Sequence, residues 1–157
     1  MCSTGGMKHW PPPPPRPAPP RPRSLLLFHP VPVGPRADGW TPARQADFIG
    51  YLAETRSVLA ACRRVRMGRE SAYRLRKRPG AAGFAAAWDA ALGKPHTPVA
   101  LSSSKSTGLG AGYRSRVGIA QVRLYAGRYA ATSWKPDNNA LLSHLAQLDR
   151  ACRNIEP

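Results

Sequence analysis

Acidic residues are scarce in this chain. Its 157 residues include only 8 aspartates and glutamates against 24 lysines and arginines, which gives a formal net charge of +16. Such an imbalance says little about the fold, but it indicates a polyanionic partner, most commonly nucleic acid or an anionic membrane surface. With so few carboxylates, no pair has an obvious setting for general acid–base catalysis.

Cysteines and long apolar runs are also few. Cys2, Cys62 and Cys152 are odd in number and scattered, so we expect free thiols, no disulfide framework and a reducing, cytoplasmic environment. The longest uncharged apolar run, SLLLF at 24–28, is far too short to cross a bilayer and makes a poor secretory signal. The sequence therefore predicts a cytoplasmic protein of one domain, or two very small ones, that does not enter a membrane.

No constellation of residues suggests catalysis or metal binding. The four histidines lie far apart in the sequence, and none has a metal-ligand spacing to a cysteine. The serines at 102–104 have no adjacent base, and GLGAG at 108–112 lacks the GK[ST] ending of a phosphate-binding loop. We therefore expect a protein that is not an enzyme, with no catalytic residue, no metal and no cofactor.

Proline is concentrated at the start of the chain. Residues 1–39 hold twelve of the eighteen prolines, including PPPPPRPAPPRPR at 11–23. Because proline fixes φ and has no backbone N–H donor, this segment should sample polyproline II and remain unpacked. We interpret it as a disordered basic tail, with a ligand for proline-reading domains as the alternative, and expect order to begin at Trp40.

Four helical patterns follow this tail and predict a small helical domain at 40–92. The expected helices cover 42–54, 58–65, 70–77 and 82–92. Thr41-Pro42 is a typical helix start, since a hydroxyl cap is followed by proline at the first helical position, and Ser57 can cap the second helix. The expected core comprises Trp40, Phe48, Leu52, Phe84 and Trp88.

The remaining residues predict a linker and a small C-terminal unit. Residues 93–119 have no acidic residue and no sustained periodicity, so we interpret them as a flexible linker. Within 120–152, two alternating segments flank Ala126-Gly127 and predict a β-hairpin, after which Asp137 or Asn138 can cap a helix at 139–151. One stripe of that helix carries Leu141, Leu142, Leu145 and Leu148. We expect this stripe to fold onto the hairpin, with homo-oligomer assembly as the alternative.

Two short helices joined by a tight turn, the second rich in arginine, predict a helix-turn-helix arrangement. With Arg66 at the turn, every position expected to face inward is apolar, and Cys62 is small enough for a close helix crossing. The inward positions are Ala61, Val65, Met67, Ala72 and Leu75. Residues 44–78 hold ten basic residues against three acidic ones, a net charge of +7. This combination predicts that double-stranded DNA is the partner.

The expected DNA contacts fall into two groups, because readers of the major groove present the first turns of one helix to base edges and flanking cations to phosphates. The expected base-edge residues are Arg69, Glu70, Ser71 and Arg74. The expected phosphate ligands are Arg63, Arg64, Arg76, Lys77 and Arg78. The alternative is a helical protein–protein interaction module whose basic face is merely solvated and does not bind DNA.

Residues 40–92, with WTPARQADFIGYL, SAYRLR and AAWDAAL, resemble short bacterial helix-turn-helix proteins of mostly unassigned function. They resemble more distantly the homeodomain-like DNA-binding part of phage terminase small subunits. Residues 125–151 are similar to the tail that accompanies this domain in the bacterial proteins. The resemblance implies a mainly α fold, with a small homeodomain-like domain followed by a β-hairpin and a helix. It also implies a transcriptional regulator or a terminase-small-subunit-like factor.

The chain departs from these resembling proteins at the turn. The resembling proteins usually have glycine at this position, because the turn needs a positive φ, whereas this chain has Arg66. Gly68 stands where they usually have serine as the N-cap of the second helix. Arginine in that conformation costs roughly 1 kcal/mol, and glycine is a cap weaker by only a few tenths of a kcal/mol, so the turn is less well specified here.

Overall fold

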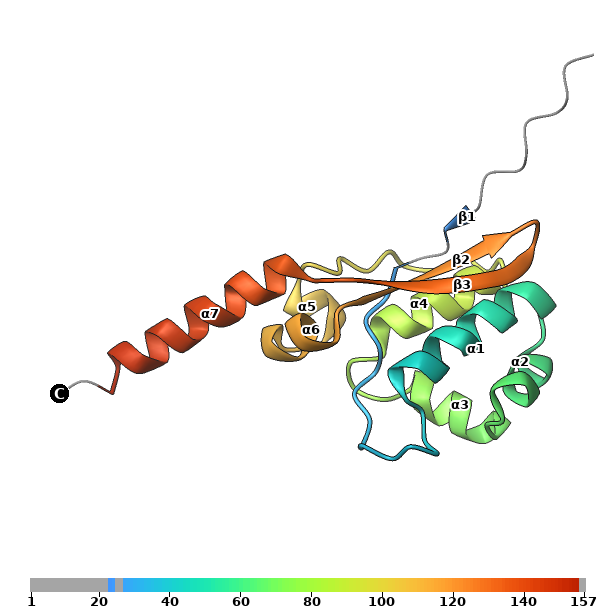
Figure 1. Cartoon of the computed structure of the whole chain (residues 1–157), viewed down its shortest axis with the longest axis horizontal. Coiled ribbons are helices and arrows are strands. Elements are labelled where there is room, and N and C mark those ends of the chain that lie inside the picture. Colours follow the sequence, from blue (N-terminus) through green and yellow to red (C-terminus); the bar gives the residue numbers. More distant parts are fainter. Residues whose placement is uncertain (1–22, 25–26, 156–157) are drawn as a thin grey trace, which may run out of the picture.

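The fold is described from a computed structural model over residues 23–24 and 27–155 (Figure 1). Over these residues the chain is mainly helical, with an antiparallel sheet in the order β1-β2-β3. The helices are α1 (Pro42–Thr55), α2 (Val58–Val65), α3 (Arg69–Arg76), α4 (Ala82–Ala91), α5 (Ser104–Thr107), α6 (Ala111–Val117) and α7 (Asn138–Arg153). The strands are β1 (Arg23–Ser24), β2 (Ile119–Tyr125) and β3 (Arg128–Lys135). No helix in the described ranges is long and apolar enough to cross a bilayer.

The starts of the first two helices follow local sequence signals. Thr41 caps α1, because its side-chain oxygen accepts a hydrogen bond from the backbone N–H of Arg44 at 3.3 Å, and Pro42 occupies the first helical position. Ser57 caps α2 in the same way, with the backbone N–H of Ala60 as donor at 3.4 Å. The four helices predicted within 40–92 are confirmed, with ends that agree to within one residue.

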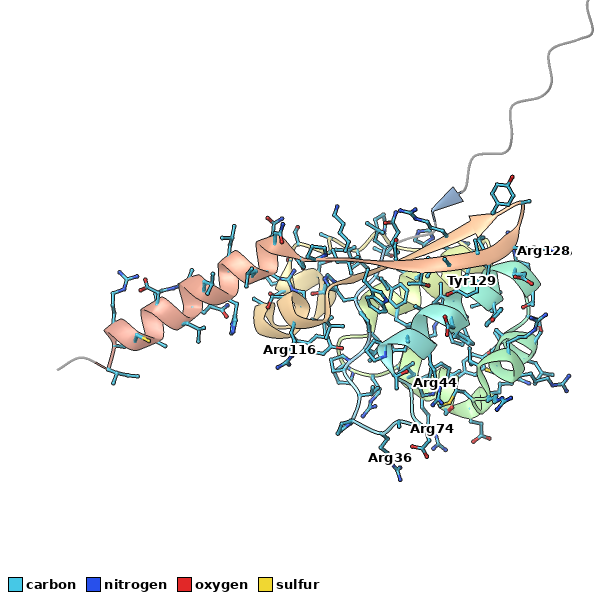
Figure 2. All side chains as sticks on the ribbon, viewed as in Figure 1. Arg36, Arg44, Arg74, Arg116, Arg128 and Tyr129 are labelled. Carbon is cyan, nitrogen blue, oxygen red and sulfur yellow. The ribbon has the colours of Figure 1, made fainter. Side chains whose placement is uncertain are left out.

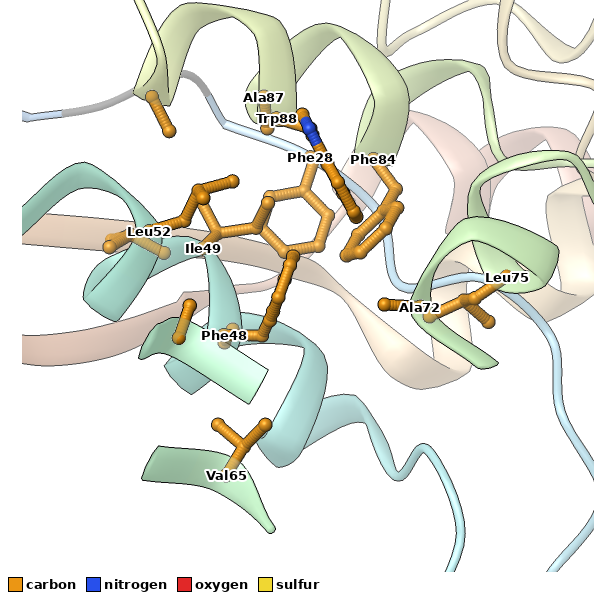
Figure 3. Close-up of a cluster of buried hydrophobic side chains, with 14 of the residues drawn as sticks. Phe28, Phe48, Ile49, Leu52, Val65, Ala72, Leu75, Phe84, Ala87 and Trp88 are labelled. Atoms are coloured by element: carbon orange, nitrogen blue, oxygen red, sulfur yellow. The ribbon is translucent and has the colours of Figure 1, made fainter. Parts of the chain in front are cut away.

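An aromatic cluster forms the centre of the core (Figure 3). The ring centroid of Phe48, on α1, lies 4.8 Å from that of Trp88 and 6.1 Å from that of Phe84, both on α4. Trp40 completes the group, since its ring meets Phe48 edge-on at 5.5 Å. Such aromatic pairs stabilise a small domain beyond their buried area. The predicted core group of Trp40, Phe48, Leu52, Phe84 and Trp88 is confirmed as buried.

The expectation that residues 1–39 form an unpacked tail is wrong for the part that the structure describes. Phe28 is fully buried, and its ring meets that of Phe84 at 5.8 Å. Its backbone N–H and carbonyl both pair with Ala120 of β2, and the side-chain amide of Gln45 bonds both the N–H and the carbonyl of Val31. The chain is therefore ordered before Trp40, because Ala120 and Gln45, from distant elements, hydrogen-bond to backbone N–H and carbonyl groups of this proline-rich stretch. The polyproline run at 11–22 lies outside the described residues.

The expectation of a flexible linker at 93–119 is also wrong. This stretch contains α5 and α6 and buries Leu109, Ala111 and Arg114. Arg114 supplies polar contacts that a pattern of apolar residues does not reveal. Its guanidinium donates hydrogen bonds to the carbonyl oxygen of Leu101 at 2.6 Å and to Ser104 Oγ at 3.2 Å. Hydrogen bonds from a buried cation, together with the buried Leu109 and Ala111, therefore hold this segment in place.

The predicted hairpin is confirmed and packs across α1. Its two-residue turn, Ala126-Gly127, has φ of 48° and 77°, which is the left-handed turn that joins twisted strands. Tyr129 on β3 connects the hairpin to α1 through two carboxylates. Its hydroxyl donates to Asp47 Oδ1 at 2.8 Å, and its backbone N–H donates to Glu54 Oε2 at 2.7 Å. Burial is the main cause that raises the pKa of the Tyr129 hydroxyl to about 12.

The last helix is confirmed, but the expected use of its leucines is wrong. Asp137 caps α7, since its Oδ1 accepts a hydrogen bond from the backbone N–H of Ala140 at 2.9 Å. Figure 1 shows α7 extending away from the rest of the molecule rather than folding back over the hairpin. The hairpin packs on α1 instead, through contacts such as those of Tyr129 with Asp47 and Glu54. The stripe of Leu141, Leu142, Leu145 and Leu148 is exposed.

Candidate nucleic-acid interface

The turn between α2 and α3 is short and closed by backbone hydrogen bonds. Arg66 ends α2 in the left-handed conformation, with φ of 58° and ψ of 42°. The N–H of Arg66 donates to the carbonyl of Arg63 at 3.3 Å, and that of Met67 donates to the carbonyl of Cys62 at 3.0 Å. These bonds satisfy carbonyls that would otherwise lack partners at the helix end. The turn that the sequence predicted at Arg66 is confirmed, including its positive φ.

Small and apolar side chains fix the angle between the two helices. Ala61, Cys62 and Val65 are buried on α2, and Ala72 and Leu75 are buried on α3. Gly68 is the N-cap of α3, with extended φ of −70° and ψ of 140° and no side chain to accept a hydrogen bond. The N-cap residue therefore provides no side-chain hydrogen bond to the first backbone N–H groups of α3. The opposite side of α3 faces outward.

Three of the four predicted base-edge residues lie on this outward face. Arg69, Glu70 and Arg74 are exposed. Glu70 Oε2 and Arg74 Nη2 are 3.6 Å apart, one turn apart on the helix, and both side chains are more than four-fifths exposed. An ion pair this exposed contributes little to stability, so breaking it to form contacts with another molecule would cost little free energy.

Ser71, the fourth predicted base-edge residue, is used inside the protein. Its hydroxyl accepts a hydrogen bond from Trp40 Nε1 at 3.1 Å and donates one to the carbonyl of Gly68 at 2.7 Å. These bonds connect the first turn of α3 to Trp40, which precedes the N-cap of α1. A shallow concavity of about 300 Å³ borders this contact, lined by Trp40, Ser71, Arg74, Leu75 and Arg78. Ser71 therefore positions α3, and Arg74 and Arg78 are the cations beside it.

The five predicted phosphate ligands divide into two kinds. Arg63, Arg64, Lys77 and Arg78 are exposed, and the guanidinium of Arg64 lies 5.4 Å from the ring centroid of Tyr51. Arg76 differs, because its side chain is only 30% exposed and its Nη2 lies 2.9 Å from Asp89 Oδ2. Its guanidinium also lies over the Trp88 ring at 5.3 Å. Arg76 thus connects α3 to α4, whereas the other four remain exposed.

Arg36 and Arg44 are cations near α3 that the sequence did not single out. Arg44 is half-buried, and its Nη1 donates to the carbonyl of Gly39 at 2.8 Å, which holds the loop before α1. Arg36 is exposed in that loop, and Figure 2 shows Arg36 and Arg74 pointing outward from the same lower edge of the molecule. The sequence signal for Arg36 is the turn-forming stretch PRADG at 35–39, which falls within the predicted tail.

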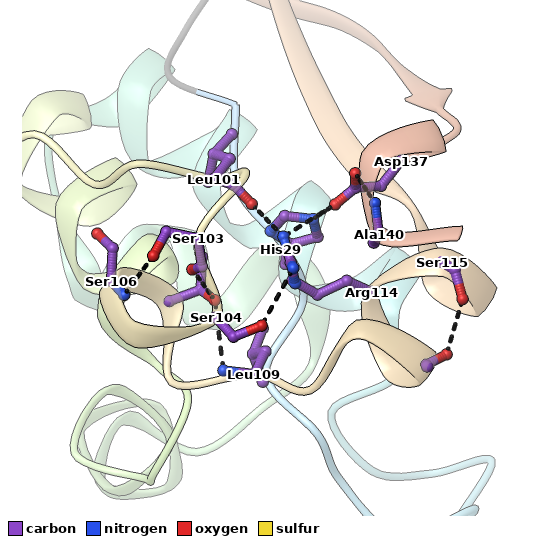
Figure 4. Close-up of polar contacts among 12 residues, drawn as sticks. His29, Leu101, Ser103, Ser104, Ser106, Leu109, Arg114, Ser115, Asp137 and Ala140 are labelled. Atoms are coloured by element: carbon purple, nitrogen blue, oxygen red, sulfur yellow. Dashed lines mark hydrogen bonds and ion pairs between the residues drawn. The ribbon is translucent and has the colours of Figure 1, made fainter. Parts of the chain in front are cut away.

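A buried polar cluster lies away from this face, where α6 and the start of α7 meet residue 29 (Figure 4). Asp137 Oδ2 lies 3.0 Å from His29 Nε2 and 3.3 Å from Arg114 Nη1, and all three side chains are buried. Burial lowers the pKa of His29 from its ordinary value, which the neighbouring Asp137 only partly offsets. The cluster is closed to solvent and joins segments far apart in the chain, so we regard it as structural. The described residues hold no group of three or more His, Cys, Asp or Glu side chains that could bind a metal.

No family model, no curated protein and no solved structure matches this chain. The resemblance to bacterial helix-turn-helix proteins and terminase small subunits therefore stays a prediction.

Proposed function

We propose that this is a helix-turn-helix protein that binds double-stranded DNA by placing the first turns of α3 in the major groove. One observation carries the proposal. A short turn joins α2 to α3, the inner face of α3 is buried through Ala72 and Leu75, and Arg69, Glu70 and Arg74 stand exposed on its outer face. An α-helix held at the surface with such side chains fits the width of the major groove.

The distribution of charge supports the same proposal. Asp47, Glu54, Asp89 and Asp137 all face other parts of the protein, where they accept hydrogen bonds. Most of the basic residues near α3 remain exposed, so the surface around it is more positive than the composition alone suggests. Arg63 and Arg64 at the end of α2, and Lys77 and Arg78 after α3, are exposed and are the proposed phosphate ligands. Phosphate contacts of this kind set register and affinity, and base contacts set specificity.

The proposed biological role is transcriptional regulation, with a terminase-small-subunit-like role in DNA packaging as the second candidate. The two roles differ in assembly, because packaging subunits form rings and many regulators form dimers. They also differ in genetic setting, since a packaging protein would be encoded beside other packaging genes.

The first test is the salt dependence of binding to a duplex of random sequence, measured by fluorescence anisotropy. The logarithm of the association constant should fall with that of the salt concentration at a slope of about −0.9 per phosphate contact. About four contacts would give roughly a hundredfold loss of affinity between 50 and 200 mM salt. Absence of binding at 50 mM would contradict the proposal and favour the protein-interaction alternative.

The second test separates base reading from charge, using a preferred site selected from a random pool. Arg74→Ala should cost about 1–3 kcal/mol on the preferred site and little on random DNA. Lys77→Ala should weaken binding to both alike and reduce the salt slope by about one unit. Arg150→Ala is the matched control, because Arg150 is an exposed arginine on α7, outside the proposed interface. If Arg74→Ala and Lys77→Ala weaken binding alike on every duplex and Arg150→Ala does not, α3 does not read sequence and its basic face is only an electrostatic anchor. If none of the three changes binding, the proposal that α3 binds DNA is wrong.

A further inference from the structure

The exposed stripe of α7 has the spacing of a two-helix seam. Leu141, Leu145 and Leu148 are spaced by four and then three residues, and the same alternation continues to Cys152 and Ile155. The three leucine side chains are 45%, 52% and 49% exposed. Apolar residues repeating at alternate intervals of three and four form the contact line along which two helices pack in a coiled coil.

Nothing in the described part of the chain covers this stripe. The first two turns of α7 touch the rest of the molecule, where Ala140 is buried and the ring of His144 lies against Gly112 of α6. From Leu145 onward every residue of the helix is exposed. A helix of 16 residues that projects from its domain is marginal by itself, and most helical stability in proteins comes from packing of an apolar face.

We propose that this stripe is a dimerisation surface, on which α7 of a second copy of this chain packs in parallel. The spacing requires a helical partner with an apolar seam, and α7 is itself such a helix. A helix that lies on a membrane surface carries many cations along its polar face. Here the polar side of α7 holds Asn139, Ser143, Gln147, Arg150 and Arg153, so it carries only two cations, and with Asp149 the helix has a net charge of +1. This near-neutral helix lets two strongly basic chains meet without direct repulsion at the seam.

The parallel direction follows from which residues would face one another. In a parallel pair each seam position meets its own copy, so Asn138 faces Asn138 and Cys152 faces Cys152 of the second copy. An antiparallel pair would set Asn138 against the C-terminal end of the other seam, where Cys152 and, past the helix end at Arg153, Ile155 offer its amide no polar partner. The parallel pair also brings His144, beside the seam, next to Asp149 of the second copy. A single asparagine in the seam is a known means of fixing register.

The size of the seam predicts a weak dimer. Sixteen residues give a contact about 24 Å long and about 10 Å wide, or roughly 250 Å² on each copy. Stable interfaces bury about 1,200–2,000 Å² in total, so this contact falls well short of one. The expected behaviour is a weak monomer–dimer equilibrium rather than a permanent dimer.

Sedimentation of the full chain over about 1 to 200 μM tests the proposal, in a buffer without DNA and with reductant. The wild-type mass should rise from one chain to two across this range. Leu145→Lys should remain a monomer throughout, because it places a charge in the middle of the seam. Ser143→Lys adds the same charge to the same helix on the side away from the seam, and should dimerise as the wild type does. A wild-type monomer at every concentration, or equal behaviour of the two variants, would overturn the proposal.

Cys152 reports the direction of pairing. Facing Cα atoms at one seam position of a parallel pair come within the 4.4–6.8 Å that a disulfide needs. Cys62 is buried, so in a Cys2→Ser background Cys152 is the accessible thiol. Copper–phenanthroline in air should convert the dimeric protein to a disulfide-linked species, and the same chain with Leu145→Lys should stay unlinked. A dimer that gives no Cys152 disulfide would show that the helices do not pair in parallel.

Discussion

Trp40 Nε1 donates a hydrogen bond to Ser71 Oγ at 3.1 Å, and this bond connects the start of α1 to the first turn of α3. The two residues are far apart in the sequence, and Trp40 is almost fully buried. The same hydroxyl donates to the carbonyl of Gly68, the N-cap of α3. Since Gly68 offers no capping side chain, this contact is what fixes the start of α3 against the domain.

Ser71→Ala should therefore lower the free energy of unfolding by about 1–2 kcal/mol, because Trp40 Nε1 loses its buried partner. Ser143→Ala on α7 is the matched control, since it has the same change in helix propensity at an exposed position. Urea unfolding followed by tryptophan fluorescence measures both. An equal effect of the two substitutions would show that the Trp40–Ser71 bond contributes nothing.

Arg66→Gly should stabilise the protein by about 0.5–1 kcal/mol. Arg66 has φ of 58°, where a residue with a Cβ atom is strained and glycine is not. Arg63→Gly removes the same side chain within α2, where glycine lowers stability by about 1 kcal/mol. Thermal unfolding at low salt should therefore show shifts of opposite sign. A lower Tm for Arg66→Gly would contradict the left-handed turn between α2 and α3.

Gly50→Ala should be strongly destabilising. A Cβ atom at residue 50 of α1 would lie 2.3 Å from the Tyr129 ring of β3, so the hairpin would have to move. Overpacking of this kind costs about 1–3 kcal/mol, which exceeds the roughly 1 kcal/mol that alanine gains over glycine within a helix. Gly34→Ala, with no atom within 4 Å, is the control and should change little. If Gly50→Ala raises the Tm, the hairpin does not pack on α1 at this point.

Stability should fall as the pH is lowered through the range where histidine titrates. Burial lowers the pKa of His29 in the folded protein, so the unfolded chain takes up a proton at higher pH than the folded one does. The stability that depends on neutral His29 is thus present above the unfolded pKa of about 6.5 and declines as the pH falls below it. The decline ends once the folded pKa is passed.

His29→Gln should flatten this dependence, because glutamine can keep a hydrogen bond to Asp137 without titrating. Urea midpoints between pH 7.5 and 5 measure the slope, and His96→Gln, at an exposed position, serves as the control. A slope in His29→Gln that equals the wild-type slope would assign the pH dependence to other groups.

The local signals in the sequence determined most of the helices and the hairpin. Thr41-Pro42, Ser57 and Asp137 each offered a side-chain cap within three residues of the donor that it satisfies, and Ala126-Gly127 offered a two-residue turn. Such interactions involve neighbours in the chain, so they can be recognised without the fold. The aromatic core could be predicted for a similar reason, because its members recur at helical spacing.

Contacts between distant residues decided the rest. Phe28 joins the core through contacts with Ala120 and Phe84. Arg114 pairs with Asp137 and so anchors the stretch that was expected to be a linker. Neither contact leaves a pattern among neighbouring residues of the sequence. Tertiary structure also separated residues that look equivalent in the sequence. Arg76 and Lys77 are adjacent cations at the end of α3, but only Arg76 meets Asp89 and Trp88. A charge run shows which residues are basic, and only packing decides which of them find an internal partner and which remain exposed to a ligand.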